Sequence, residues 1–269
     1  MNRIVYCYLF IVLFPIFALS QTKTRAQKKA ERKEKIDKLI KREEEGALIY
    51  QKQNIYGGKL NSDGYGVFFE KGYLKTATLA NLFSIEIGER KHPKEARSAI
   101  SGIFSNNNFF IYGKINSFFY AKLGVAQSLL IGGKGRRNGV AVSTIYGGGL
   151  SLGLLKPVYL NVRDPLSQQE EQIKYKNDNS RNDSLFLTPS TIVNSLGIFK
   201  GFGEVKVKPG LFVKTGLRFD YGHYNETVSA VEVGINAEYY ISKMPIMALT
   251  KEKSFFINLY AAVEFGKRK

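Results

Sequence analysis

The sequence predicts an all-β protein, an antiparallel transmembrane β-barrel of eight strands. Three observations predict it: the composition, a hydrophobic period of two over long segments, and connections that alternate between long and short. The 269 residues include Gly 26, Tyr 16 and Phe 19 but no Trp and only three Met, and glycine weakens helices whereas aromatic residues favour strands. The hydrophobic share is 44%, and no window approaches the roughly 20 apolar residues of a transmembrane helix. A barrel has such ordinary hydropathy because lipid-facing and lumen-facing residues alternate.

The N-terminus has the pattern of a cleaved signal peptide. A cationic start, Met1-Asn2-Arg3, precedes an apolar stretch over residues 4–17. Small residues at Ala18 and Ser20 then predict cleavage between Ser20 and Gln21. Residues 1–20 are therefore expected to be removed, and with them the chain's only cysteine, Cys7. The mature chain would have no thiol and no disulfide, and we predict no metal site and no cofactor.

Residues 21–46 form a charged block that differs from everything after it. Glu31–Lys35, Glu34–Lys38 and Asp37–Lys41 are pairs four residues apart in the favourable acid-before-base order. The block predicts a solvated periplasmic helix, ending near Gly46, that is marginal on its own. Either a charged spacer or a binding segment for a periplasmic protein fits this pattern, with the spacer favoured.

From Ile55 onward the hydrophobic period changes to two, which predicts a barrel domain with the bounds 47–269. The last strand is the clearest: apolar residues from Phe255 to Phe265 share one face, and Asn258, Tyr260 and Glu264 share the other. The eight predicted strands cover residues 54–61, 64–71, 77–89, 117–131, 139–154, 211–221, 227–241 and 255–265. A further arm over residues 109–115 leaves ten strands as an alternative.

The connections predict the topology. Residues 90–116, 155–208 and 244–253 are long and fall at one end with the tight turn at 62–63, whereas 72–76, 132–138 and 222–226 are short. Bacterial outer-membrane barrels have long external loops and short periplasmic turns, so both chain termini are expected in the periplasm. The polar centre of the external loop 155–208 predicts an exposed, mobile segment.

The layout, and the end S-F-F-I-N-L-Y-A-A-V-E-F-G-K-R-K, resemble small outer-membrane β-barrel proteins of Gram-negative bacteria. In that class the final strand alternates aromatic residues and ends at or near Phe, where the barrel-insertion machinery recognises it. Phe265 matches that position, and the tail Gly266-Lys267-Arg268-Lys269 departs from it. The resemblance implies the fold and a place in the outer membrane, and it implies no activity.

The net charge of +17 raises the question of an anionic partner. Nucleic acid is not expected, because the chain carries no nucleic-acid motif and is exported. Outer-membrane lipids, with the phosphates of lipopolysaccharide, are the more plausible counter-charge, and solvated surface lysines are the other interpretation.

Charged residues of both signs fall on the predicted lumen face. These residues are Glu86, Lys122, Lys214, Arg218, Asp220, Glu232, Glu238 and Glu264. Buried charges need partners, and an eight-stranded barrel is only about wide enough to be filled by side chains. The sequence therefore predicts a closed, salt-bridged lumen in which the glutamates neutralise Arg218 and Lys214; a proton or ion path is the alternative.

For three other motifs, a structural role is favoured over a catalytic or ligand-binding one. The G-x-S-x-G pattern at residues 149–153 lies in a strand and not on the strand-to-helix elbow that a hydrolase needs. His92 and His223 are predicted at opposite ends of the barrel, and the glycine-rich residues 132–137 lack phosphate-loop spacing. No enzyme is predicted. A structural or interaction protein of the envelope or of a secretion machine is favoured, with a lipid-modifying barrel enzyme (His92 beside a serine) or a narrow ion channel as alternatives.

Overall fold

A computed structural model describes residues 50–99, 109–134, 139–178, 180–197, 199–222 and 226–269. The expected signal peptide, its cleavage site and the charged helix at 21–46 lie outside these residues. Within the described ranges, no helix is both long enough and apolar enough to cross a bilayer.

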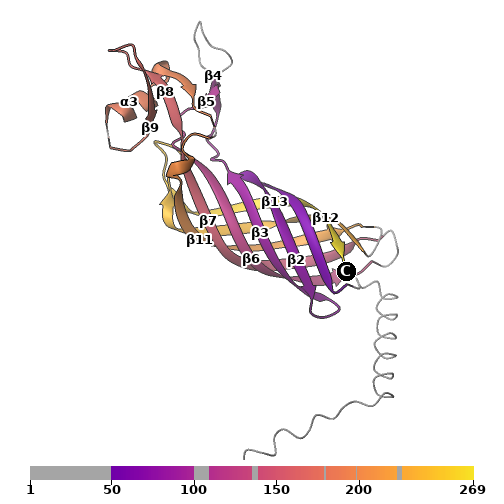
Figure 1. The fold of residues 1–269 in the computed structure, drawn as a ribbon. Coiled ribbons are helices and arrows are strands. Elements are labelled where there is room, and N and C mark those ends of the chain that lie inside the picture. The colour runs from indigo at the N-terminus through magenta and orange to yellow at the C-terminus, as the bar shows by residue number, and fades with distance from the viewer. Residues whose placement is uncertain (1–49, 100–108, 135–138, 179, 198, 223–225) are drawn as a thin grey trace, which may run out of the picture. The chain divides into compact units, whose positions relative to one another are not determined.

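Eight antiparallel strands close into a barrel (Figure 1). They are β1 (Lys52–Asn61), β2 (Gly64–Leu74), β3 (Leu79–Arg90), β6 (Asn116–Gly132), β7 (Ala141–Pro157), β11 (Lys206–Asp220), β12 (Thr227–Met244) and β13 (Lys253–Arg268). Each strand pairs with the next barrel strand along the chain, and β1 pairs with β13 to close the sheet. The predicted fold class is therefore confirmed, with each barrel strand at or close to its expected position.

The register fixes the tilt of the strands. Hydrogen-bonding partners can be followed from Phe255 around the sheet through Tyr239, Leu211, Leu150, Leu123, Ile85, Phe69 and Tyr56. Tyr56 then pairs with Phe265, so the path returns to β13 shifted from Phe255 by ten residues. Eight strands with this shift are tilted by about 40° from the barrel axis.

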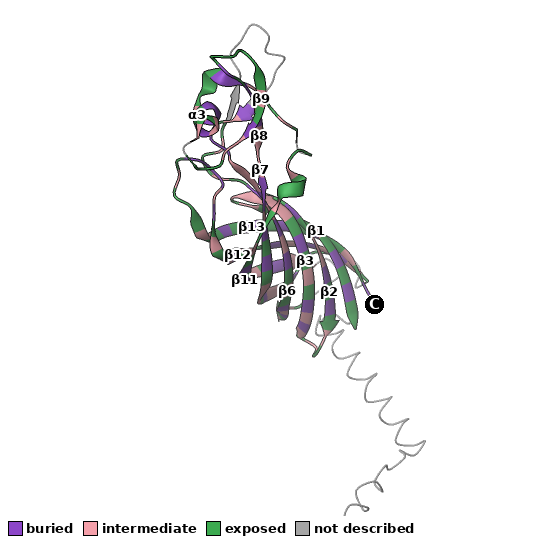
Figure 2. Cartoon of the chain, turned by 60° about the vertical axis from the view of Figure 1, so that its left-hand side comes forward, coloured by how far each residue is buried: buried purple, intermediate pink, exposed green. Residues whose placement is uncertain are grey.

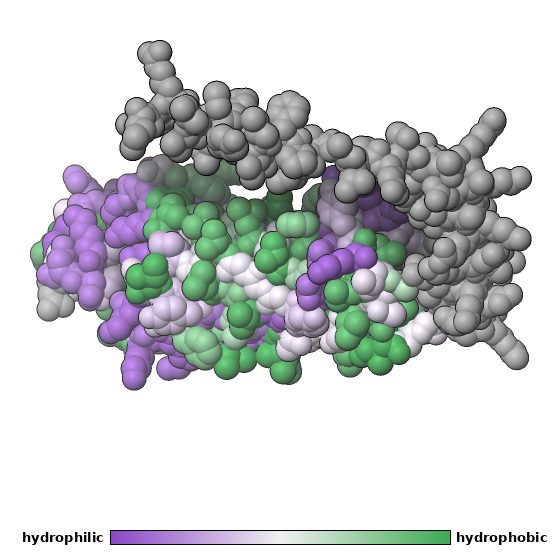
Figure 3. Space-filling model, turned by 90° about the horizontal axis from the view of Figure 1, so that it is seen from below, coloured by the Kyte–Doolittle hydropathy of each residue, from purple (hydrophilic) through white to green (hydrophobic). Residues whose placement is uncertain are grey.

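An apolar band surrounds the barrel. The alternating residues on the outer face are exposed, for example Val233 at 41%, Leu259 at 63% and Phe265 at 58%. Along β13 the band runs from Phe255 to Phe265, about 25 Å along the barrel axis at this tilt, which matches the apolar height of membrane barrels. Figure 2 shows the resulting alternation of buried and exposed positions along each strand, and in Figure 3 hydrophobic residues cover much of the barrel face in view. The distribution is that of a barrel surrounded by lipid.

The residues expected to form a mobile loop at 155–208 are folded instead. They contain β8 (Tyr159–Arg163), β9 (Glu170–Lys174), α3 (Arg181–Leu187), η2 (Pro189–Thr191), β10 (Ile192–Ser195) and η3 (Phe202–Glu204). The strands form a separate sheet in the order β10-β8-β9. We call β8, β9, α3 and β10 the loop module.

The loop module has an apolar core of its own. Its buried residues are Leu160, Val162, Ile173, Leu185, Phe186 and Ile192, and Phe110 from outside the module packs with them. The expectation of a mobile loop was wrong because these apolar residues are few and separated by polar ones. Each short element contributes one or two of them, too few to give a recognisable period.

The arm expected near 109–115 does not enter the barrel. Residues of β5 (Phe109–Ile111) pair with β4 (Arg97–Ala99) in a separate two-stranded sheet. The ten-stranded alternative is therefore wrong. Phe110 of this small sheet is 5% exposed and packs into the core of the loop module.

Candidate functional site: the lumen network and the loop cleft

The structure places all eight predicted charged residues on the lumen side of the barrel wall. Seven of them are at most 6% exposed, and the side chain of Lys214 is 9% exposed. Parity along each strand explains this, because every second residue of a strand points inward. The ion pairs divide along the barrel into three groups.

The central group surrounds Arg218. Its guanidinium lies 2.9 Å from Glu70, 2.8 Å from Glu232 and 2.7 Å from Glu264. Lys214 adds a second cation 3.6 Å from Glu232. One arginine therefore joins carboxylates from three different strands, β2, β12 and β13, across the lumen.

A second group lies toward the end of the barrel that carries the loop module, here called the module end. Lys122 lies 2.7 Å from Glu238 and 3.4 Å from Glu86, which also pairs with Lys59. Arg90 lies 2.7 Å from the same Glu238 and 2.9 Å from Asp63 in the tight turn. The expectation that Glu238 neutralises Arg218 is wrong, since Glu238 is held by Lys122 and Arg90.

A layer of aromatic rings covers the second group. The Arg90 guanidinium lies 4.6 Å from the centroid of Phe256 and 5.5 Å from that of Phe118. Phe118 and Phe256 are themselves 5.7 Å apart between ring centroids. This part of the lumen is thus filled by rings packed at tilted angles and by an arginine that is 2% exposed.

The third group lies at the opposite end, where the C-terminus is, here called the terminus end. Asp220 pairs with Arg268 and with Lys134, whose ammonium is 3.3 Å away. Lys134 also donates to the carbonyl of Gly222 at 2.6 Å. The basic tail after Phe265 therefore continues the last strand and contributes to the lumen.

Together these three groups pair the charges of the barrel interior. The ion pairs above join seven cations, namely Lys59, Arg90, Lys122, Lys134, Lys214, Arg218 and Arg268, to seven anions, namely Asp63, Glu70, Glu86, Asp220, Glu232, Glu238 and Glu264. Such balance offsets the large cost of burying charge. The interior of the described barrel is a salt-bridged core.

Sequence reasoning missed Lys59, Asp63, Glu70, Arg90, Lys134 and Arg268. Parity could have found Lys59 and Glu70, because both lie on predicted strands whose inward faces had not been assigned. Arg90 and Arg268 follow the same parity but lie just beyond the predicted ends of their strands. Asp63 and Lys134 lie in turns, where no alternation indicates their direction.

The small residues of the G-x-S-x-G pattern make room for lumen side chains. A Cβ at Gly153 would lie 2.5 Å from Met244 and 2.9 Å from Tyr240. The Ser151 hydroxyl is 2.9 Å from the hydroxyl of Tyr240 and is buried. This serine lies in the middle of β7 and belongs to the packed interior.

His92 lies in the connection after β3. Its backbone N–H donates to Glu95 at 3.0 Å, and its ring Nδ1 accepts from the backbone N–H of Lys94 at 3.2 Å. Partial burial lowers the pKa of the imidazole. The ring therefore serves a local turn. His223 and residues 135–138 lie outside the described residues.

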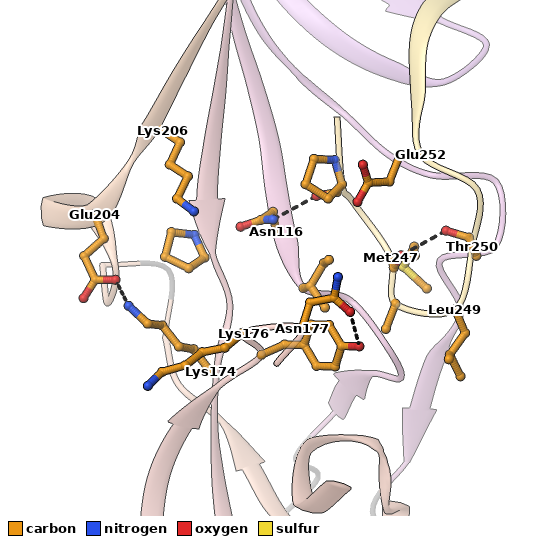
Figure 4. A pocket seen from close by; sticks show the side chains of 15 residues that line it. Asn116, Lys174, Lys176, Asn177, Glu204, Lys206, Met247, Leu249, Thr250 and Glu252 are labelled. Carbon is orange, nitrogen blue, oxygen red and sulfur yellow. Dashed lines mark hydrogen bonds and ion pairs between the residues drawn. The ribbon is translucent and has the colours of Figure 1, made fainter. Parts of the chain in front are cut away.

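A cleft opens between the loop module and the connection from β12 to β13 (Figure 4). Its volume is about 440 Å³. Lys174 and Lys176 come from the end of β9 and the residues after it, and Lys206 from the start of β11; Thr250 and Glu252 come from the β12–β13 connection. Figure 4 shows Lys206 and Glu252 on opposite sides of the space.

Left-handed backbone occurs on both walls of the cleft, and hydrogen bonds to a buried carboxylate hold one of them. On one wall, the buried Asp183 carboxylate accepts the backbone N–H groups of Lys176 and Asp178, each at 2.8 Å. Between them, Asn177 has a left-handed backbone with φ of 61°. On the other wall, Leu249 has φ of 58° and is 80% exposed. Such backbone conformations in residues other than glycine are concentrated at functional sites.

Lys174 and Glu204 form an ion pair on the lysine side of the cleft. The Lys174 ammonium and the Tyr159 hydroxyl both donate to Glu204, the latter at 2.7 Å. These hydrogen bonds lower the pKa of Glu204, and Glu204 raises the pKa of Lys174. Lys206 and Glu252 are exposed polar groups at the same cleft.

Comparisons with known proteins give likenesses of shape alone. No protein-family model matches the sequence, and no curated protein is significantly similar to it. Among solved structures, the chain is similar to the N-terminal β-barrel domain of Pseudomonas aeruginosa OprF, with a TM-score of 0.33 and 10% identity over 81% of this chain and 100% of that one.

Two further structures are similar over a comparable length. Ail, the attachment invasion locus protein of Yersinia pestis, has a TM-score of 0.35 and 11% identity, covering 82% of this chain and 100% of its own. A major outer membrane protein from Thermus thermophilus has a TM-score of 0.39 and 11% identity, covering 80% of this chain and 100% of its own. The assignment of this chain as a transmembrane β-barrel rests on its closed sheet, its apolar band and its charged lumen.

Proposed function

We propose that the chain is a non-enzymatic outer-membrane protein whose closed barrel anchors a binding surface made by the loop module and the cleft. The observation that carries the proposal is the contrast between the barrel lumen and the loop module. Balanced ion pairs fill the lumen, whereas the loop module has a separate core that holds a shaped surface at one end. A protein of this design fits an accessory role in the envelope or in a secretion machine.

The proposed orientation has the loop module outside the cell and both termini in the periplasm. The two longest connections between barrel strands, residues 91–115 and 158–205, lie at the module end, whereas those at the terminus end, such as 75–78, are all short. Bacterial barrels have short turns in the periplasm and longer loops outside. The expected signal peptide supports export across the inner membrane.

The cleft is the most concrete binding site for a partner. Its volume of about 440 Å³ falls within the usual range for ligand sites, and its lining is more polar than apolar, with several charged side chains beside a few apolar ones. Lysines on one side and Glu252 on the other suit a ligand group or peptide segment that carries both signs of charge. The exposed Leu249 at the edge adds an apolar contact.

Photo-crosslinking in intact cells tests this proposal. A photoreactive residue at Leu249 or Tyr175 should give one discrete adduct, and a Glu252→Lys variant should abolish it by reversing the charge of one wall. The same residue at lipid-facing Ile235, which is 47% exposed on the barrel wall, should give lipid adducts only. An absence of adducts at both cleft positions, or an adduct that Glu252→Lys leaves unchanged, contradicts a partner at this site.

Two assays separate the alternatives. Planar-bilayer recording of the purified protein should show no steady conductance, because the lumen charges are paired and buried. Conductance on the scale of a general porin would replace this proposal with a channel. Lipid A mass spectra should be the same with and without the protein, and a change in acyl or phosphate content would favour a lipid-modifying enzyme.

A further inference from the structure

A short segment between the loop module and β11 rests on the outside of the barrel wall. We call residues 199–202 the rim segment. Lys156 belongs to the outward row of β7, which continues from the exposed Leu150 and Leu152 through Leu154. The Lys156 ammonium donates to the carbonyl of Lys200 at 3.2 Å and lies 5.5 Å from the centroid of Phe202. The rim segment therefore covers the outward row and not the lumen.

Gly201 allows this close packing. Its φ of 92° lies in the left-handed region, and a Cβ there would come within 2.8 Å of the Pro157 carbonyl oxygen. Only glycine satisfies both conditions without a shift of the backbone. The position of the rim segment against the end of β7 is thus determined by the local sequence.

The register gives the height of the rim segment on the barrel. The path of hydrogen-bonding partners from Phe255 descends by about 3 Å at each strand, so Leu150 lies about 9 Å lower. Along β7 toward the module end, the height increases by about 2.5 Å per residue. Leu154, four residues after Leu150, therefore lies at about the level of Phe255. Lys156 then lies about 5 Å above the apolar band, a headgroup depth. Lys253, exposed and two residues before Phe255 on β13, faces outward at the same height.

The rim segment presents two aromatic rings and one ammonium group together. Phe199 is 90% exposed and Phe202 is 53% exposed, although both are large and apolar. Lys200 is exposed between them, with its ammonium 5.5 Å from the centroid of Tyr159. Aromatic and long basic side chains gather at membrane interfaces, where rings contact the acyl boundary and lysines reach the headgroups.

We propose that the rim segment docks on the bilayer leaflet at the module end, with Phe199 and Phe202 in the interface and the exposed Lys200 against lipid phosphates, while the buried Lys156 holds the segment to the end of β7. Three observations support this occupant. The rim segment is continuous with the lipid-facing row of β7, its height matches the headgroup region, and its charge complements anionic lipid. The contact would anchor the loop module at one point beside the cleft. The inference rests on the barrel lying in a membrane, and it is independent of what the cleft binds.

Single-tryptophan fluorescence tests the docking directly, because the natural chain contains no Trp. The Phe199→Trp and Phe202→Trp variants are each reconstituted in vesicles of phosphatidylcholine and phosphatidylglycerol. Separate preparations contain lipids that are brominated at shallow or at deep acyl positions. Both variants should emit at shorter wavelength than a water-exposed indole. Bromines at shallow acyl positions should quench them, and aqueous iodide should quench them severalfold less than it quenches a water-exposed indole. Circular dichroism verifies that each barrel is folded.

Two matched positions calibrate these signals. Leu166→Trp places the indole at a site in the β8–β9 turn that is 92% exposed, and it should behave as an indole in water. Ile235→Trp places it about halfway down the apolar band, where deep bromines should quench most strongly. The proposal is overturned if the two rim variants match Leu166→Trp in emission and iodide quenching while Ile235→Trp is quenched by lipid.

The charge component has its own test. Adding Lys200→Glu to Phe202→Trp should weaken bromine quenching in vesicles that contain phosphatidylglycerol. In vesicles of phosphatidylcholine alone the effect should be much smaller, because no net anionic charge is then available. An equal loss in both vesicle types would show that the lysine acts on the local fold, and would overturn the phosphate contact.

Discussion

The lumen and the loop module use the same charged residue types in opposite ways. In the lumen, Arg218 and Glu264 are 4% and 0% exposed, and their ion pairs are part of the packed core. In the loop module, the side chains of Arg163 and Glu170 are 53% and 42% exposed, and their pair lies on the surface of a small apolar core. Burial therefore decides whether a salt bridge is essential to its region or nearly dispensable.

The difference follows from how each region satisfies the hydrogen-bonding groups of its backbone. The closed barrel pairs the edges of its sheet in register, which leaves side-chain complementarity in the lumen as the remaining requirement. The loop module has short strands and a seven-residue helix, so burial of Phe186, Leu160 and Val162 supplies most of its stability. Substitutions in the two regions should thus produce global and local effects respectively.

The largest effect is expected for Arg218→Ala. Removing the guanidinium leaves Glu70, Glu232 and Glu264 buried together with Lys214 as the remaining cation of the central group. The free energy of unfolding of the whole barrel should fall by about 3–5 kcal/mol. Urea unfolding of the protein in detergent or lipid, followed by circular dichroism, measures it.

A double variant controls for simple loss of packing. Arg218→Met with Glu264→Gln removes one charge of each sign, and its cost should be smaller than the sum of the two single costs. Additive costs would mean that the ion pair at 2.7 Å does not couple the two residues.

Phe186→Ala should cost a similar amount, about 3–5 kcal/mol, but only within the loop module. Phe186 is 0% exposed at the centre of that core and contacts Tyr175, with ring centroids 5.7 Å apart. Limited proteolysis should cut residues 158–197 rapidly while the barrel keeps its unfolding midpoint. A lower barrel midpoint would show that the two regions unfold as one unit.

Val233→Arg should cost about 2–4 kcal/mol, because it places a charge near the middle of the lipid-facing band. Val233 is 41% exposed on the outer face of β12. Val233→Leu, with the same facing and no charge, is the control and should be close to neutral. The unfolding equilibrium in bilayers compares them. An equal cost for both variants would place Val233 away from lipid.

The barrel was largely predictable from the sequence, because alternation is a repeated and local signal. Along β13, the apolar residues Phe255 and Leu259 and the polar residues Asn258 and Glu264 fall on the faces that parity assigns to them. The approximate position of each strand and the inward direction of the eight predicted lumen charges follow from this pattern. The outward exposure of Tyr239 and Ile235 follows in the same way.

Pairing and the loop module were not predictable. The contact between Arg218 and Glu70 joins residues 148 positions apart, and it depends on the ten-residue register shift that closes the barrel. The cleft lining includes left-handed backbone at Asn177 and Leu249; Asn is a residue type that permits this conformation, whereas nothing about Leu249 signals it. Long-range register and irregular backbone are decided by closure and packing, which period-two patterns do not encode.

The smallest effect is expected from acid, and it should distinguish the loop module from the barrel. The backbone N–H of Leu166, with Ser167 and Arg181, lowers the pKa of Asp164 below its usual value. Hydrogen bonds from Lys174 lower the pKa of Glu204, and those from Arg163 lower the pKa of Glu170. Three carboxylates of this region therefore favour the folded state in their charged form.

A carboxyl group with a lowered folded-state pKa gives stability that is complete above its unfolded pKa and is lost as the pH falls through the folded one. The loop module should therefore become more accessible to amide hydrogen exchange below about pH 4, while the barrel strands stay protected. Asp164→Asn removes the ionisation at the β8–β9 turn. It should raise exchange near that turn at neutral pH and reduce the additional change in acid. An unchanged acid response in that variant would show that Asp164 does not report the folding of the module, and would leave Glu204 and Glu170 as the groups responsible.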